Sequence, residues 1–270
     1  MKGKPVVRSA DVRDGVRELG VRAGDCLLVH SSLSSFGYVE GAADGVIDGL
    51  LEALGPEGTL VLPTLTWNLV HCDNPVFDPR STPSVVGLIT EVFRKRPGVL
   101  RSLHPTHSCA ATGPGAARLL QDHEKDVTPC GRRSPYARLI AAGGKILFLG
   151  VDLACNTTFH ALEEMAVVPY LFDRCEDLYS IGPDGRKIPV LTRRHARNMP
   201  RDFVKPEAPL EQAGILRVAQ IGAAEVRLVG ATAMAELVLG MLARDPFVLL
   251  GRLAARRERK RYEKWSTPNP

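Results

Sequence analysis

Two short apolar runs separated by one helix-sized segment constrain the fold of this chain more than any other feature. The runs at 25–30 and 59–63 have the length and composition of buried strands. The segment between them, 43–54, has the apolar spacing of a helix and ends at the turn Gly55-Pro-Glu-Gly58. Strand, helix and strand at this spacing predict a β-α-β unit with a parallel strand pair.

Similar patterns along the chain predict an α/β protein with a central mixed, largely parallel sheet flanked by helices and long functional loops. A helix is expected from a capping Ser9 to a terminal Gly20. Other helices are expected at 84–96, at 134–143 and from about Ala231, and other strands at 99–111 (broken by a proline), 145–150 and 225–230. A hairpin is expected at 177–190, and loops at 64–83 and 119–136.

The positive charge of the chain is concentrated at one end. The formal net charge is +5, and residues 251–270 hold seven basic and two acidic side chains, so the other 250 residues are neutral overall. We therefore expect one α/β domain, 1–250, followed by a basic C-terminal tail, 251–270, which forms a solvated helix or a frayed end. The remainder gives no reason to expect nucleic-acid binding.

The first residues of the chain and its cysteines indicate the cellular compartment of the protein. No run reaches the eighteen or so apolar residues of a membrane span, and the first residues lack the apolar stretch of a signal peptide. Six cysteines without a C-x-x-C pair are typical of reduced thiols rather than of disulfides. We expect a cytoplasmic protein with no membrane partner and no disulfide, and the sequence leaves open whether it forms a homodimer.

A histidine and a carboxylate lie three residues apart directly after the strand expected at 145–150. His160 and Glu163 share one face of the helix that begins there, since residues three apart are neighbours on a helix. An imidazole beside a carboxylate can remove a proton from a weakly nucleophilic amine or thiol. This pair predicts general-base chemistry.

Four blocks, in chain order, together resemble the aminoglycoside 3-N-acetyltransferase family, also called the antibiotic N-acetyltransferase family. They span 28–44, 55–64, 101–108 and 156–163, and they include Leu28-Val-His-Ser-Ser-Leu-Ser-Ser-Phe-Gly37 and Asn156-Thr-Thr-Phe-His-Ala-Leu-Glu163. The resemblance implies acetyl-CoA-dependent transfer of an acetyl group to an amine. It also implies an α/β fold distinct from that of the other large acetyltransferase superfamily.

The resemblance assigns roles to His160 and to the serine-rich loop, and the chemistry and position of the other residues suggest theirs. His160 is the expected general base, Glu163 orients it or holds the ammonium group, and His107 lines the acceptor side. The cofactor contacts are expected from Ser108, which would polarise the thioester carbonyl or grip pantetheine, and from the loop Ser31, Ser32, Leu33, Ser34, Ser35, Phe36 and Gly37. Substrate contacts are expected from Trp67, Asp73, Asp152 and Glu164, and Glu164 could exchange roles with Glu163. No metal site is expected.

Other readings remain open from the sequence. His104, His107, His160 and Glu163 could instead bind zinc in a hydrolase, Cys109 or Cys155 could relay the acetyl group, and the chain could bind CoA without catalysis. The acceptor is also open. Residues 122–177 hold nine acidic and six basic side chains, which suits a cation, whereas 178–210 hold seven basic and three acidic ones, which favours a neutral or anionic amine. Such an amine would place the enzyme in biosynthesis rather than in antibiotic resistance.

Overall fold

Seven strands form the central sheet of the computed structural model, which describes residues 6–266 and the side chains of the last helix as far as Tyr262. Their order across the sheet is β11 (Leu216–Ile221), β12 (Ala224–Gly230), β8 (Lys145–Leu149), β2 (Cys26–Ser31), β4 (Thr59–Pro63), β7 (Cys109–Thr112) and β6 (Leu100–Arg101). The sheet is mixed. Strands β8, β2 and β4 run parallel to one another, and antiparallel strands extend both edges.

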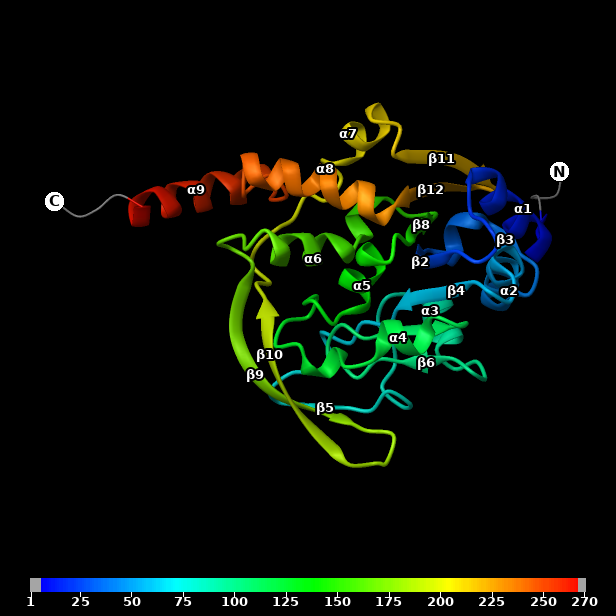
Figure 1. Ribbon diagram of the computed structural model, residues 1–270, viewed down its shortest axis with the longest axis horizontal. Coiled ribbons are helices and arrows are strands. Elements are labelled where there is room, and N and C mark those ends of the chain that lie inside the picture. Colours follow the sequence, from blue (N-terminus) through cyan, green and yellow to red (C-terminus); the bar gives the residue numbers. More distant parts are fainter. Residues whose placement is uncertain (1–5, 267–270) are drawn as a thin grey trace.

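Side chains of the three parallel strands alternate between two apolar cores, one on each face of the sheet. Leu28 belongs to one core and its neighbours Leu27 and Val29 to the other, as the period of two in a strand requires. The first core is covered by α4 (Ala116–Leu120), α5 (Pro135–Ala141), α6 (Thr158–Met165) and α8 (Ala231–Arg244). The second is covered by α1 (Ser9–Leu19), α2 (Ala42–Leu54) and α3 (Leu88–Phe93). Figure 1 shows α5, α6 and α8 on one side of the strands and α1 and α2 on the other.

A long hairpin projects from the end of α6. Its strands, β9 (Phe172–Ile181) and β10 (Lys187–His195), pair antiparallel, and β5 (Val76–Phe77) adds a short third strand. The hairpin curves away below α6 in Figure 1. Val190, Thr192 and Arg194 alternate inward along β10, and a register shift between Arg193 and His195 then interrupts the pairing. Two further strand residues, Val6–Val7 (β1), pair with β3 (Tyr38–Val39).

The β-α-β prediction is confirmed, since β2, α2 and β4 occupy the expected segments and β2 pairs parallel with β4. The helix at 134–143 begins at the cap Ser134, whose hydroxyl accepts the backbone N–H of Ala137 at 3.2 Å, as its sequence indicates. Strands β8 and β12 also lie where they were expected. The basis of these predictions was local, because each element carries its own apolar pattern and its own cap or turn.

Other predicted details were wrong. Ser9 is not the cap of α1; that position is Arg8, whose backbone N–H donates to the carboxylate of Asp11 at 2.7 Å. The helix expected at 84–96 is regular only at 88–93, because Gly87 has a φ of 115°, outside the helical region. The strand expected at 99–111 is two antiparallel strands, β6 and β7. Strand β11 was not predicted.

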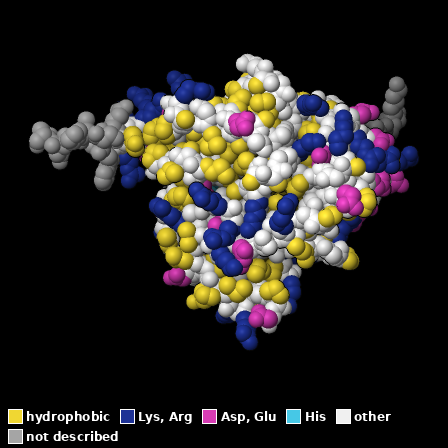
Figure 2. All heavy atoms as spheres, in the orientation of Figure 1, with side chains coloured by type: hydrophobic (Ala, Val, Ile, Leu, Met, Phe, Trp, Pro, Cys, Tyr) yellow, Lys and Arg dark blue, Asp and Glu magenta, His cyan; other side chains and the backbone are white. Residues whose placement is uncertain are grey.

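The basic C-terminal segment is a helix, α9 (Arg252–Ser266), that packs on the body at its beginning. Ala254 and Ala255 are part of the core that includes α8, and Glu258 is buried. In Figure 1 α9 extends α8 outward. Figure 2 shows that Lys and Arg side chains are not confined to this helix, since they also gather across the middle of the same face, below α6 and α8. Within the described residues, no helix is both long and apolar enough to cross a membrane.

Candidate active site

The carboxyl ends of β2, β4 and β8 meet beside two adjoining cavities. Strand β4, which follows β2 through α2, lies on one side of β2, and β8 lies on the other side. The direction in which strands are added to the sheet therefore reverses at β2. Ligands of open α/β sheets bind at such a switch point, outside the carboxyl ends of the strands. Both cavities are lined by residues that follow these three strands.

The larger of the two, here called the His160 cavity, has a volume of about 350 Å³. It lies between the start of α6, the loop after β4 and the end of β10. Its lining residues are Leu65, Trp67, Thr106, His107, Pro129, Ala154, Thr157, His160, Arg194, His195, Ala196, Arg197, Arg201 and Phe203. Of the residues predicted from the sequence, the structure therefore brings His160, His107 and Trp67 together here.

The smaller one, the Ser31 cavity, has a volume of about 250 Å³ and shares Leu65 and Thr157 with the first. Its other lining residues are Val29, His30, Ser31, Pro63, Val86, Thr90 and Cys155. His30 stacks on Phe148 with ring centroids 5.3 Å apart, and burial lowers the pKa of His30 to about 3. Its Nε2 atom is buried and has no hydrogen-bond partner among the described residues. The His30 ring is thus a neutral part of this wall, and its Nε2 atom is not exposed.

His160 and Glu163 make the contact predicted from their spacing. The Nδ1 atom of His160 lies 2.6 Å from Oε2 of Glu163, one helical turn away. Glu163 is fully buried, while 20% of the His160 side chain is exposed. The carboxylate therefore fixes the orientation of the ring and leaves Nε2 as the nitrogen that can react in the cavity.

Glu163 is held ionised by its partners. The hydroxyl of Tyr170 donates to Oε1 of Glu163 at 2.8 Å, and Nε of Arg201 lies 3.4 Å from the same oxygen. Burial acts to raise the pKa of Glu163, but the hydrogen bond with His160 and the charges of His160 and Arg201 hold it below its ordinary value. A carboxylate at this position stabilises a positive charge on His160 when the ring takes up a proton.

Glu164, the next residue of α6, contacts a different histidine. Its Oε1 lies 2.9 Å from Nε2 of His195, and it also accepts hydrogen bonds from the hydroxyl of Thr128 at 2.6 Å and the backbone N–H of Cys130 at 2.9 Å. Burial raises the pKa of Glu164 to about 7. The question left open by the sequence is thus answered geometrically: Glu163, not Glu164, contacts His160.

A row of histidines continues from this pair into the interior. His195 lies between His160 and His107, with ring centroids 4.4 Å and 5.2 Å away. His104 stacks on His123 at 4.7 Å. Burial lowers the pKa of His104, His107 and His195 well below its usual range, so these rings are neutral at physiological pH.

The serine-rich loop after β2 is more tightly packed than its composition indicates. Ser31 lines the cavity, whereas Ser35 donates to the backbone carbonyl of Gly150 at 2.7 Å and Phe36 is buried in the second core. The Ser32 and Ser34 hydroxyls lie 3.1 Å apart. Leu33 packs partly on the same core, and Gly37 has a φ of 85° that favours glycine. The core encloses the Phe36 side chain, so a contact of the cofactor with this residue would involve its backbone, and the cofactor role of the loop stays a prediction.

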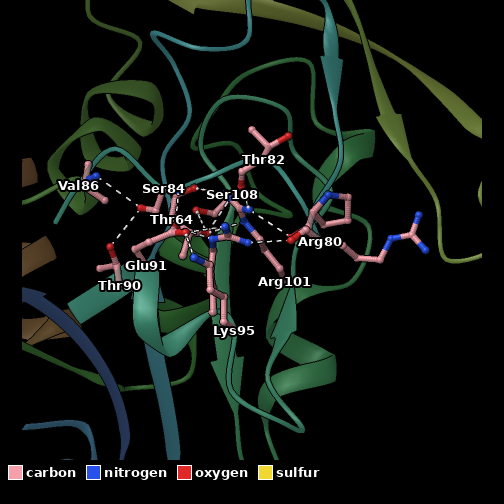
Figure 3. A network of polar contacts seen from close by, with 12 residues as sticks. Thr64, Arg80, Thr82, Ser84, Val86, Thr90, Glu91, Lys95, Arg101 and Ser108 are labelled. Atoms are coloured by element: carbon pink, nitrogen blue, oxygen red, sulfur yellow. Dashed lines mark hydrogen bonds and ion pairs between the residues drawn. The ribbon is translucent and has the colours of Figure 1, made fainter. Parts of the chain in front are cut away.

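Ser108 lies in a buried polar network rather than in either cavity (Figure 3). Its hydroxyl donates to the backbone carbonyl of Thr64 at 2.8 Å and accepts from Nε of Arg101 at 3.1 Å. Arg101 also donates to the carbonyls of Thr64 and Thr82, at 2.8 Å and 2.5 Å, and burial lowers its pKa to about 9. This network anchors the loop that carries Trp67 onto the sheet. The geometry therefore does not support a direct contact between the Ser108 side chain and the cofactor.

The structure does not bring the predicted acidic substrate contacts into the His160 cavity. Asp73 is 88% exposed beside His71, and Asp152 accepts the backbone N–H of Ala154 at 2.9 Å as the cap of a short 3₁₀ helix. Glu164 lies behind His195. In their place three arginines, Arg194, Arg197 and Arg201, line the cavity, and no Asp or Glu of the described residues does so. The basic segment 178–210 therefore does reach the acceptor side.

The sequence prediction missed four residues of the site, namely Tyr170, Arg194, His195 and Arg201. The inward alternation of β10 could have indicated Arg194. His195 could not have been found in this way, because the register shift after Arg193 turns two successive side chains inward.

The donor atoms proposed for zinc do not converge. Within the described residues, the set of His104, His107, His160 and Glu163 is not among the groups whose donor atoms lie within 4.8 Å of one another. Cys130, Glu164 and His195 do lie that close, and the hydrogen bonds to Glu164 account for it. All six cysteines are free; Cys109 is buried, and burial raises its pKa to about 12, which opposes its use as an acetyl carrier.

A third cavity, of about 640 Å³, lies beneath α9. Tyr170 and Ala196 line it, together with Phe247, Arg257 and Tyr262. It shares Ala196 with the His160 cavity but contains none of the histidines, so we place the chemistry in the smaller pair of cavities.

Comparison with known proteins identifies the family of this chain. A family model described as aminoglycoside 3-N-acetyltransferase matches residues 28–243. Aminoglycoside N(3)-acetyltransferase IV of Salmonella sp is 35% identical over 246 residues, which cover 90% of each chain. A histidine-to-alanine mutant of aminoglycoside acetyltransferase AAC(3)-IVa, solved in complex with gentamicin, is similar with a TM-score of 0.82 and 32% identity, covering 95% of this chain and 99% of that one. The AAC-IIIb binary complex with CoASH has a TM-score of 0.80 and 26% identity, covering 89% and 97%.

Proposed function

Because the chain belongs to the aminoglycoside 3-N-acetyltransferase family, we propose that it acetylates an amino group of an aminoglycoside with His160 as the general base. Its family makes it a CoA-dependent N-acetyltransferase with acetyl-CoA as the co-substrate. The acceptor and the roles of individual residues are the proposed part. The observation that carries the proposal is the His160–Glu163 pair at the wall of a cavity.

The chemistry follows from the state of this pair. An acceptor amine that attacks the thioester carbon gains a positive charge and must lose a proton for the amide to form. Nε2 of His160 takes that proton, and the buried carboxylate of Glu163 stabilises the resulting imidazolium through Nδ1. His160 then returns the proton to the departing sulfur of CoA, so that the amine proton ends on the thiol.

The two adjoining cavities fit the two substrates. We place the acceptor in the His160 cavity and the pantetheine arm of acetyl-CoA in the Ser31 cavity, so that the thioester meets the amine near Thr157 and Leu65, which belong to both. The side chains of Ser31 and Thr90 offer hydroxyl groups at the wall of a mostly apolar cavity. Such a lining suits a chain of methylenes and amides.

The cationic wall of the acceptor cavity restricts how an aminoglycoside enters. Arg194 is paired with Glu176 at 3.5 Å, and Arg201 with Glu163, whereas Arg197 donates to the backbone carbonyl of Trp67 and lies over the Trp67 ring. A positive wall disfavours ammonium groups relative to neutral amines. We therefore place the reacting amine at the arginine side, where it gives up its proton and reacts as the free base, and the other ammonium groups toward solvent.

An acceptor panel tests the proposed function. Thiol release from acetyl-CoA would be followed with an aminoglycoside bearing a free 3-amino group, the same compound already acetylated there, an amino sugar and an anionic amine. We expect release with the first compound and loss of release with its acetylated form. Release confined to the anionic amine, or no release with any aminoglycoside, would overturn the assigned acceptor.

A further inference from the structure

A second carboxylate–imidazole pair lies beside the first, and the mechanism above does not use it. Glu163 and Glu164 are consecutive on α6 but contact different histidines, His160 and His195. The two imidazole rings are 4.4 Å apart between centroids, and both line the same cavity. If the His195–Glu164 pair only stabilised the fold, it would not need to lie beside the proposed general base.

The second pair is built to receive a proton rather than to hold a charge. His195 is neutral because burial lowers its pKa, and its Nδ1 atom is buried and has no hydrogen-bond partner among the described residues. Its Nε2 atom contacts Glu164, whose pKa burial raises to about 7. A proton that enters at Nδ1 can therefore leave from Nε2 to a carboxylate that is ready to accept it near neutral pH.

The overall reaction requires such an acceptor. Amines of aminosugars have pKa values of about 8 to 10, so most of the acceptor arrives as an ammonium ion near neutral pH. Conversion of an ammonium ion to an amide releases two protons, and the CoA thiolate takes up only one. The path through His160 carries that one, and the other has no assigned destination.

We propose that Glu164, acting through His195, takes the first proton from the bound ammonium ion, and that His160 takes the second during attack. This inference rests on the proposed function. The ammonium N–H gives its proton to Nδ1 of His195, the proton on Nε2 passes to Glu164, and the neutral amine and the neutral acid result. After product release Glu164 returns the proton to solvent. His195 is thus a proton-transfer residue and Glu164 the group that acts through it.

The charged groups around the pair are compatible with this role. Asp126, Glu163 and Cys130 face Glu164, and the two carboxylates act to raise its pKa. The groups that face His195 are His160, His107, His104 and Arg201, and all of them act against a positive charge on it. The proton is therefore transferred through His195 without resting there, and it accumulates on Glu164.

The pH dependence of kcat/KM tests the proposal. In Glu164→Gln only the free-base fraction of the acceptor remains productive, so kcat/KM should fall about tenfold or more at about pH 7.5 and approach the wild-type value at about pH 9.5. Glu211→Gln, at an exposed position on α7 (Glu207–Gln212), serves as the matched control and should follow the wild type. His195→Asn should behave like Glu164→Gln.

Four results would overturn the proposal or its premise, and they differ from one another. A loss that is equal at both pH values indicates a structural role, and an unchanged profile indicates no role. If the wild type itself acetylates no aminoglycoside at any pH, the proposed function has failed instead. Independently of any acceptor, infrared spectra of the wild type should show a carboxylic acid C=O band that disappears as the pH rises through about 7 and is missing in Glu164→Gln; its absence from the wild type would also refute the proposal.

Discussion

Replacement of Glu163 by glutamine tests how much the buried carboxylate contributes to the reaction. The amide is nearly isosteric but neutral. When the imidazole is protonated, the hydrogen bond of 2.6 Å at Nδ1 of His160 therefore no longer has a negatively charged acceptor. A hydrogen bond to a charged group contributes about 1.5–3 kcal/mol. Since about 1.4 kcal/mol corresponds to a factor of ten, kcat should fall about 10- to 150-fold. The amide can also donate to Nδ1 and favour the wrong tautomer, which acts in the same direction.

The assay is thiol release at saturating acetyl-CoA and aminoglycoside, with thermal unfolding measured in parallel. Tyr170→Phe removes only the hydroxyl that donates to Glu163 at 2.8 Å and should lower kcat about threefold to tenfold. The order wild type, Tyr170→Phe, Glu163→Gln is therefore expected. A Glu163→Gln enzyme that is folded and retains kcat within about twofold of the wild type would refute the role of the carboxylate.

Three other predictions concern stability and charge. Arg101→Met should lower the free energy of unfolding by about 2–5 kcal/mol, because the carbonyls of Thr64 and Thr82 lose a buried donor; chemical denaturation checks this, and a loss no larger than that of the exposed control Arg80→Met would contradict it. Arg197→Gln should lower the KM for an aminoglycoside about threefold to tenfold at low salt, because it removes about 1 kcal/mol of repulsion at the cavity; a higher KM would show instead that Arg197 binds the acceptor. Folding raises the pKa of Glu164 from 4.5 to about 7. As the pH rises from about 4.5 to 7, the unfolded chain therefore ionises Glu164 more readily than the folded one, and the wild type should lose up to about 3 kcal/mol of stability relative to Glu164→Gln. A difference in unfolding free energy that does not change over this range would contradict the raised pKa.

The parts of the fold that depend on local pattern were predictable. Residues 25–63 carry two buried strands and the helix between them, and each has its own apolar period and its own turn. The contact of His160 with Glu163 was predictable for the same reason, because helical spacing alone places the two side chains on one face.

The remainder of the site depends on contacts between distant segments. Phe36 and Ser108 have side-chain types and positions that are compatible with cofactor binding, yet the core encloses one and Arg101 engages the other. His195 reaches the cavity only because β10 changes register beside it, which no period of two could indicate. The cationic wall has the same origin, since the hairpin brings a basic segment against α6.

The central claim is that His160 is the general base of an acetyl-CoA-dependent aminoglycoside acetyltransferase, and one comparison tests it most directly. The turnover of His160→Ala and its affinity for CoA would be measured beside those of the wild type and of His71→Ala, a partly exposed histidine outside both cavities. The account predicts that kcat falls about 10²- to 10⁴-fold in His160→Ala alone, with the affinity for CoA unchanged. A wild-type rate in a folded His160→Ala enzyme would contradict it.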